Sequence, residues 1–415
     1  MREMKDSGVE WLGEVPAGWK ITPIKHLFYI SKNIAGRTGF DVLSITQQGL
    51  KVKDVKSGEG QLASDYSHYQ IVEPGDFAMN HMDLLTGWID LSDKTGVTSP
   101  DYRVFKARTI GINKRYYLRI FQYYYSARVF YGFCKGISNK GRWRLPADAF
   151  RAIQVPLPPR DEQRRIADYL DEKCAEIDRA VSVAEHSIEE YKAYKNSVVF
   201  QAVTKGLDVD VPMRDSGVEW LGEVPAEWGV VPGKRILMLL HRPVEDGDGV
   251  VTCFRDGEVT LRANRRTEGF TIALKEIGYQ GVEPGDLVVH GMDGFAGSIG
   301  ISDSRGKASP VLNVMGSDQN KRFLMYYMRG LAYRDVYMAL SDGIRVRSCN
   351  LSWKKISNLP FALPSLPVQS RIADYLDEEC AEIDRAVSAK QAIIADLKAY
   401  KQSLIYEVVT GKREV

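Results

Sequence analysis

The chain of 415 residues has few cysteines and no long apolar run. Its cysteines form no close pair, which excludes the spacing of a zinc site and argues against a disulfide framework. No stretch reaches the ~18 apolar residues that a membrane helix needs, and the first residues contain no apolar signal segment. We therefore expect a cytoplasmic protein that contacts no membrane. The expected reduced thiols are Cys134, Cys174, Cys253, Cys349 and Cys380.

The chain also lacks the common catalytic and nucleotide-binding motifs. It contains no Gly-x-x-x-x-Gly-Lys-Ser/Thr loop, no Gly-x-Gly-x-x-Gly and no His-Glu-x-x-His. Its one Pro-Pro pair, Pro158-Pro159, lacks the flanking residues of the DNA amino-methyltransferase loop. The nuclease-like Asp171–Lys173 recurs as Asp377–Glu379 without the lysine, so we discount it. The sequence predicts a binding protein with no catalytic residues, metal site or cofactor of its own.

What the chain does contain is a long internal repeat. Asp6–Ala17 returns unchanged as Asp215–Ala226, and Arg165–Ser182 returns as Arg371–Ser388 with a single substitution. The segments between these blocks have diverged. A repeat of this length consists of whole domains, so we predict two similar halves that can fold about a pseudo-twofold axis.

The second repeated block opens a heptad pattern in each half. A proline precedes each pattern, and Gly206 and Gly411 follow its last apolar positions, as expected for helix starts and stops. An isolated helix with such an apolar stripe would aggregate, so we expect the two helices to form a coiled coil within the chain. An ordinary long core helix is the alternative. The expected packing residues are Leu170, Ile177, Val181, Ile188, Tyr191, Leu376, Ile383, Val387, Ile394 and Leu397, with Cys174 and Cys380 as small members of the same stripes.

These patterns together predict the domain organisation. We expect an α+β protein in which two globular domains are separated by a pair of long antiparallel helices. The expected boundaries are 1–159 for the first domain, 160–206 for the first helix, 207–366 for the second domain and 367–415 for the second helix.

The diverged segments are basic. Residues 20–159 carry 20 basic and 11 acidic side chains, a net charge of +9, and residues 229–364 carry 18 and 14, a net charge of +4. The whole chain has a net charge of only +2, because the repeated parts are acidic. Basic domains suit a polyanion, since neutralised phosphates release counterions. A chance bias of a solvated surface is the alternative, mainly for the second segment.

Two patterns indicate possible contacts with nucleic acid. Ser-x-x-x-Arg-x-Arg occurs in both basic segments, and arginine pairs can bind phosphate or the guanine edge; internal salt bridges are the alternative. Polar residues after an expected strand can also reach a ligand, although a histidine there is often structural. The candidates are Asn80, His81, Ser138, Lys140, Arg142, Trp143, Arg144, His290, Ser341, Arg345 and Arg347.

An aromatic run lies between basic residues in the first segment. Tyr117, Phe121, Tyr124 and Arg128 fall at helical spacing. Such rings could stack on bases, but the spacing favours an amphipathic helix that faces the core.

The combination resembles the specificity subunit (HsdS) of type I restriction–modification systems over essentially the whole chain. The motif Gly-x-x-Trp-Leu-Gly-x-x-Pro-x-x-Trp occurs at Gly8–Trp19 and Gly217–Trp228. Val155–Pro159 leads into the first helix, and Leu363-Pro364 matches it less closely. Both helices carry Arg-Ile-Ala-x-Tyr-Leu-Asp.

The resemblance implies a function in sequence-specific binding of double-stranded DNA. Each globular domain would be a target-recognition domain that reads one half of a bipartite site, and the helices would set the spacer. The repeated parts would dock two adenine methyltransferase subunits, and restriction/translocase subunits could join. These partners would use S-adenosylmethionine, ATP and Mg²⁺, while this chain would catalyse nothing. The alternative is a scaffold or inhibitor of such a complex that no longer reads DNA.

Overall fold

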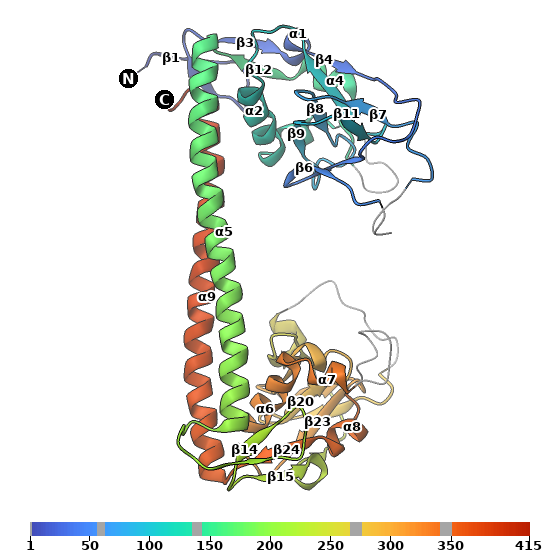
Figure 1. Cartoon of the computed structure of the whole chain (residues 1–415), viewed down its shortest axis with the longest axis vertical. Helices are drawn as coiled ribbons and strands as arrows, with labels where there is room; N and C mark the ends of the chain where they lie inside the picture. Colours follow the sequence, from blue (N-terminus) through green and yellow to red (C-terminus); the bar gives the residue numbers. More distant parts are fainter. Residues whose placement is uncertain (1, 56–62, 135–142, 266–275, 341–350) are drawn as a thin grey trace. The chain divides into compact units, whose positions relative to one another are not determined.

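The computed structural model describes residues 2–55, 63–134, 143–265, 276–340 and 351–415. The chain divides into two compact units: unit 1 comprises Met1–Ala184 and Ala392–Val415, and unit 2 comprises Glu185–Gln391. Each unit contains one globular domain and a segment of both long helices, α5 (Arg160–Lys205) and α9 (Leu366–Val409) (Figure 1). Among the described residues, no helix combines the length and apolar character needed to cross a bilayer.

The globular domain of unit 1 is built around an antiparallel sheet with the strand order β4-β11-β8-β9. Outside this sheet the strands pair as β3-β12, β1-β2, β5-β6 and β7-β10. The strands are β1 (Met4–Asp6), β2 (Glu14–Pro16), β3 (Lys20–Pro23), β4 (Phe28–Ser31), β5 (Leu43–Thr46), β6 (Gly49–Val52), β7 (Gln70–Val72), β8 (Phe77–Met79), β9 (Ile89–Leu91), β10 (Gly96–Thr98), β11 (Arg103–Ala107) and β12 (Gln154–Leu157). The helices are α1 (Ile24–Leu27), α2 (Lys114–Ser126), α3 (Val129–Gly132) and α4 (Ala147–Ala152).

The globular domain of unit 2 repeats this plan. Its central sheet has the order β16-β23-β20-β21, and the other pairs are β13-β14, β15-β24, β17-β18 and β19-β22. The strands are β13 (Met213–Asp215), β14 (Glu223–Pro225), β15 (Gly229–Pro232), β16 (Met238–Leu239), β17 (Val251–Cys253), β18 (Val259–Leu261), β19 (Gln280–Val282), β20 (Leu287–His290), β21 (Ile299–Ile301), β22 (Gly306–Ala308), β23 (Leu312–Gly316) and β24 (Pro360–Leu363). The helices are η1 (Gly233–Arg235), η2 (Arg262–Asn264), η3 (Gly294–Ala296), α6 (Lys321–Tyr333), α7 (Val336–Ala339) and α8 (Trp353–Asn358).

The two domains share their fold even where their sequences differ. Asn113 caps α2 by accepting from two backbone N–H groups, and Asn320 caps α6 in the same way. The backbone N–H of each cap donates to a buried glutamine at the start of a long helix, Gln163 for Asn113 and Gln369 for Asn320, both at 3.0 Å. The α+β class and the internal repeat are therefore confirmed.

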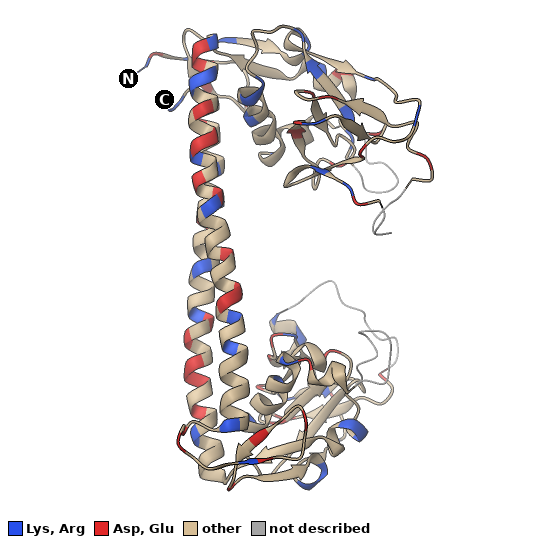
Figure 2. Cartoon of the chain, in the orientation of Figure 1, with Lys and Arg blue, Asp and Glu red and all other residues tan. Residues whose placement is uncertain are grey.

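The two long helices run antiparallel in each unit (Figure 1). In unit 2, Lys195 Nζ lies 2.6 Å from a carboxylate oxygen of Asp384, while Lys390 lies over the ring of Tyr191. In unit 1, Lys401 Nζ lies 2.6 Å from Asp178. Charges of both signs line α5 and α9 (Figure 2), as expected for helices with one apolar stripe.

The stripe itself is largely buried. Seven of the expected packing residues are buried, and Tyr191, Val387 and Leu397 are half-buried. The buried members are Leu170, Ile177, Val181, Ile188, Leu376, Ile383 and Ile394. The helix ends agree with the expected stops, because Gly206 and Gly411 have φ of 82° and 73°, the left-handed conformation that glycine adopts without strain.

Two details differ from the expectation. Helix α9 begins at Leu366, one residue before the expected Pro367. A proline in the first turn lacks only an N–H that would have no partner there, so the helix can start before it. Arg128 lies outside α2, in the left-handed conformation with φ of 59°, because the helix ends at Ser126.

The aromatic run of α2 forms core. Tyr117, Phe121 and Tyr124 are completely buried, and Phe28 packs edge-on against Tyr117 and Phe121. The interpretation as a core-facing helix is confirmed for these rings.

The described cysteines, Cys134, Cys174, Cys253 and Cys380, form no disulfide, and Cys349 lies outside the described residues. Burial raises the pKa of the Cys174 and Cys380 thiols, so both stay protonated and act as small apolar side chains.

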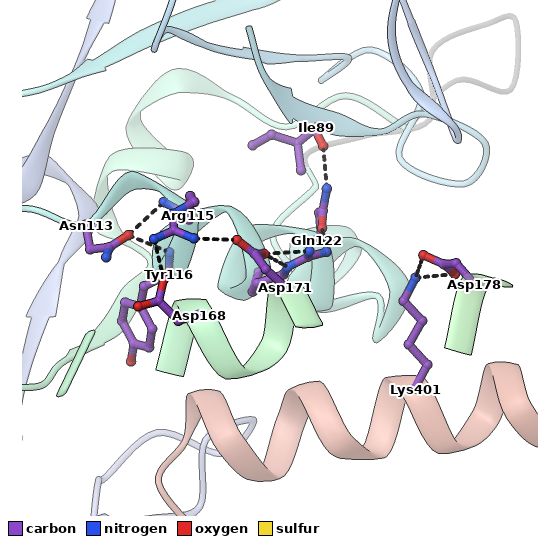
Figure 3. Close-up of polar contacts among 10 residues, drawn as sticks. Ile89, Asn113, Arg115, Tyr116, Gln122, Asp168, Asp171, Asp178 and Lys401 are labelled. Carbon is purple, nitrogen blue, oxygen red and sulfur yellow. Dashed lines mark hydrogen bonds and ion pairs between the residues drawn. The ribbon is translucent and has the colours of Figure 1, made fainter. Parts of the chain in front are cut away.

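Matching ion pairs join each domain to the start of a long helix. In unit 1, Arg115 binds Asp168 and Asp171 at 2.5 and 2.8 Å, and Arg119 binds Asp171 at 2.8 Å (Figure 3). In unit 2, Arg322 contacts Asp374 and Asp377. Asp171 binds both arginines and its side chain is 34% exposed, whereas Asp168 binds one arginine and its side chain is 59% exposed.

The stripe gives a first prediction. Ile177→Asp places a carboxylate at a side chain that is 8% exposed, and an unpaired buried charge costs several kcal/mol, on the order of 3 or more. We expect the Tm of the chain to fall strongly. Ala180→Asp is the matched control, because Ala180 is exposed on the same helix. Equal melting curves for the two variants would contradict the packing of the stripe.

The ion pairs give a second prediction. Asp171→Asn keeps the shape of the side chain but removes the charge that two arginines share, and we expect it to destabilise unit 1 by about 1–2 kcal/mol. Asp168→Asn removes a partner that is 59% exposed and binds one arginine, so its cost should stay below about 1 kcal/mol. Chemical denaturation of the two variants measures the order, and a larger effect of Asp168→Asn would contradict it.

Candidate nucleic-acid interface

The candidate residues fall into two groups. Six of them lie outside the described residues: Ser138, Lys140, Arg142, Ser341, Arg345 and Arg347. The five described candidates are Asn80, His81, Trp143, Arg144 and His290. Four of these five belong to unit 1, so the site that follows is described in unit 1.

Asn80 and His290 have the same structural role in the two domains. Asn80 Oδ1 accepts from the backbone N–H groups of Met82 and Asp83 at 3.2 and 3.3 Å. His290 Nδ1 accepts from the corresponding groups of Met292 and Asp293 at 3.2 and 3.0 Å. Both side chains hold the turn after the strand, β8 or β20. Burial lowers the pKa of His290, consistent with a ring nitrogen that accepts.

His81 has no such partner. Its side chain is 7% exposed, and within the described residues its Nδ1 is buried without a hydrogen bond. Burial, together with the charges of Arg103 and Arg144, lowers its pKa to about 3. In the repeat, Gly291 of unit 2 is the residue equivalent to His81. This buried imidazole therefore has no counterpart in the sequence of the second domain.

Trp143 and Arg144 are the first residues of the described segment 143–265. Trp143 is half-buried, with its ring centre 4.7 Å from that of Tyr131. Arg144 is exposed and forms no ion pair with a described residue. The next residue, Leu145, is buried and its N–H donates to the His81 carbonyl at 3.0 Å, which fixes where Arg144 emerges.

A pocket of about 460 Å³ brings several of these residues together. It is lined by His81 and Arg144, and by two cations that sequence reasoning missed, Lys32 and Arg103. The remaining described lining residues are Ile30, Ser31, Gln70, Pro100, Tyr102, Val104, Leu145, Pro146 and Ala147. None of these described residues is acidic, so the pocket is cationic.

Arg103 is the least expected member of the pocket. It begins β11, where it is 5% exposed, and its guanidinium lies 4.8 Å from the centre of the Phe150 ring. The only sequence signal is a cation at the start of an apolar strand, and such a cation usually points to solvent.

The imidazole gives a third prediction. The unfolded chain takes up a proton on His81 below pH 6.5, but folded unit 1 does so only near pH 3. Stability from this group is therefore complete above pH 6.5 and is lost as pH falls, by about 2 kcal/mol between about pH 6.5 and 5. As pH falls through this window, wild type should lose about 2 kcal/mol of unfolding free energy relative to His81→Leu, because the carboxylates are common to both. Parallel curves would contradict the assignment.

Comparisons with known proteins complete the description of the chain. No family model matches it. A chain from a structure of the complex assembly and conformational transition of the type I R-M system is similar over 95% of this chain and 98% of its own, with 15% identity and a TM-score of 0.67. The HsdS subunit from Thermoanaerobacter tengcongensis matches over 96% and 98%, with 15% identity and a TM-score of 0.49. The type I restriction-modification S subunit from M. genitalium matches over 94% and 96%, with 11% identity and a TM-score of 0.37.

The first of these similarities covers both domains and both long helices. This chain therefore has the fold of that type I restriction–modification chain over nearly its whole length.

Proposed function

We propose that this chain is the DNA-recognition subunit of a type I restriction–modification complex. The observation that carries the proposal is the shared fold along 95% of the chain, with two repeated domains and two long helices. The cationic pocket of the first domain supports it, because a polyanion would meet positive charge there that no described carboxylate pairs with.

Each globular domain would read one half of a bipartite site in double-stranded DNA. The frameworks are alike, but the side chains around the central sheets differ, as His81 and Gly291 illustrate. Similar frameworks can approach two half-sites in the same way through phosphate contacts, while different side chains specify different bases. The proposal thus accounts for why the fold is repeated and the sequence is not.

The repeated segments would dock two identical partners. Arg165–Ser182 and Arg371–Ser388 differ at one position, so their exposed sides offer nearly the same surface twice. The partners would be adenine methyltransferase subunits that use S-adenosylmethionine and take the target adenine out of the stack. Restriction/translocase subunits that use ATP and Mg²⁺ could join them.

In this complex the chain itself would bind the DNA and position the partner subunits, and it would catalyse no reaction. The long helices would set the number of base pairs between the half-sites. A scaffold or inhibitor with the same fold would dock the same partners but leave the sequence that is methylated unchanged.

The test is a genome-wide map of adenine methylation in the source strain, with this gene intact, deleted and restored. We expect deletion to abolish methylation at one split motif, two short specified halves around an unspecified gap, and restoration to recover it. Identical maps with a purified complex that binds all duplexes equally would contradict the proposal.

A domain exchange supplies the matched control. Replacing residues 229–364 by the corresponding segment of another subunit with this fold should change one half of the motif and leave the other half intact. A scaffold would give the same map before and after the exchange.

A further inference from the structure

The pocket of unit 1 contains a buried cation, Arg103, that has no anionic partner among the described residues. Arg103 Nη2 donates to the Leu145 carbonyl at 2.9 Å, and Nη1 is buried with no hydrogen bond to a described residue. The guanidinium also lies over the ring of Phe150. A guanidinium this far from water is normally paired with a carboxylate, because an unpaired buried charge is costly.

The surroundings of Arg103 increase the positive potential. Arg144 lies close enough to act on both Arg103 and His81, and Lys32 is exposed on the pocket wall. Burial and the charge of Arg144 lower the pKa of Arg103 to about 10, which still leaves it charged at neutral pH. The described lining therefore gathers three permanent cations and a neutral imidazole around one hollow.

The second domain shows that the fold does not need this charge. Arg103 pairs with Met79 in the β11–β8 register, and Asn313 pairs with Val289 at the equivalent place in unit 2. Asn313 Nδ2 donates to the Leu351 carbonyl at 2.9 Å, as Arg103 does to Leu145. A neutral side chain thus makes the same link to the same loop. The charge of Arg103 is extra to that structural role.

We infer that the pocket lined by Arg103, Arg144, Lys32 and His81 is a binding site for a phosphate group of the DNA backbone. The inference rests on the proposed function and assigns part of its contact surface. A phosphate group offers only hydrogen-bond acceptors and carries the negative charge that the described lining lacks. Its binding would therefore neutralise part of the positive charge of the pocket. Arg144 and Lys32 are exposed and can contact it directly, while Arg103 supplies charge from beneath.

A phosphate site and a base-reading site make different predictions. Loss of a phosphate contact weakens binding to every sequence and lowers the slope of log K against log salt by about 1. At about 0.1 M salt this corresponds to about tenfold weaker binding. Loss of a contact to guanine instead relaxes preference at one base pair and leaves binding to unrelated DNA unchanged.

The decisive variant is Arg103→Asn, which installs the residue that unit 2 uses at this position. The full chain is assembled with its methyltransferase subunits and titrated with labelled target and scrambled duplexes at several salt concentrations. We expect Arg103→Asn and Arg144→Gln each to weaken both duplexes about tenfold and to lower the salt slope by about 1. Arg108→Gln is the control, because Arg108 is an exposed arginine of the same domain that neither lines the pocket nor acts on the pKa of Arg103.

Thermal unfolding of the chain without DNA separates folding from binding. Arg103→Asn removes an unpaired buried charge and keeps the link to Leu145, so its Tm should equal or exceed that of the wild type. A clearly lower Tm would make Arg103 structural and overturn the inference. Unchanged salt slopes, or a change of preference at one base pair with the slope intact, would overturn it too. A wild-type complex that binds both duplexes equally would instead count against sequence recognition, and the slopes would still test the pocket.

Discussion

The apolar stripes of the two long helices have to be covered, and the way they are covered determines the rest of the structure. In unit 1, α2 lies against the end of α9, where Tyr116 donates its hydroxyl to the Val409 carbonyl at 3.0 Å. In unit 2, α6 packs against the end of α5, with Gly330 next to Phe200. Each domain is therefore held by the start of the helix that follows it and by the end of the other helix.

Polar contacts select this arrangement among the many that apolar burial would allow. Asp178 with Lys401 and Lys195 with Asp384 are equivalent pairs on partly exposed faces, so their contribution to stability is small. These pairs instead specify the register of α5 against α9, because a slip of one turn would place each lysine opposite another residue. The partly buried pair of Asp171 with Arg119 links α2 to α5.

The sequence was sufficient for the architecture because the relevant signals are local or repeated. Duplicate blocks predicted two domains, heptads predicted the helices, and the spacing of Tyr117, Phe121 and Tyr124 indicated a core-facing surface. The pocket could not be predicted in the same way. Arg103 is 71 residues from Lys32 and 41 residues from Arg144 along the chain, so only the folded sheet brings these charges together.

The histidines show a related limit. His81 and His290 lie in similar short sequences, and residue type alone grouped them as one kind of candidate. The register of the repeat instead aligns His290 with Asn80, and both cap a turn. The same register places Gly291 at the position of His81, and the hydrogen bonds show that the two histidines have different roles.

The division of the chain between the units also has a consequence for its synthesis. Unit 2 is one continuous segment, Glu185–Gln391, but unit 1 needs Ala392–Val415, which is translated after all of unit 2. The domain that leaves the ribosome first is therefore the one that is completed last. Until residues 392–415 have been made, the first half of α5 lacks the segment of α9 that covers its stripe, and the nascent chain has to remain soluble with that surface uncovered.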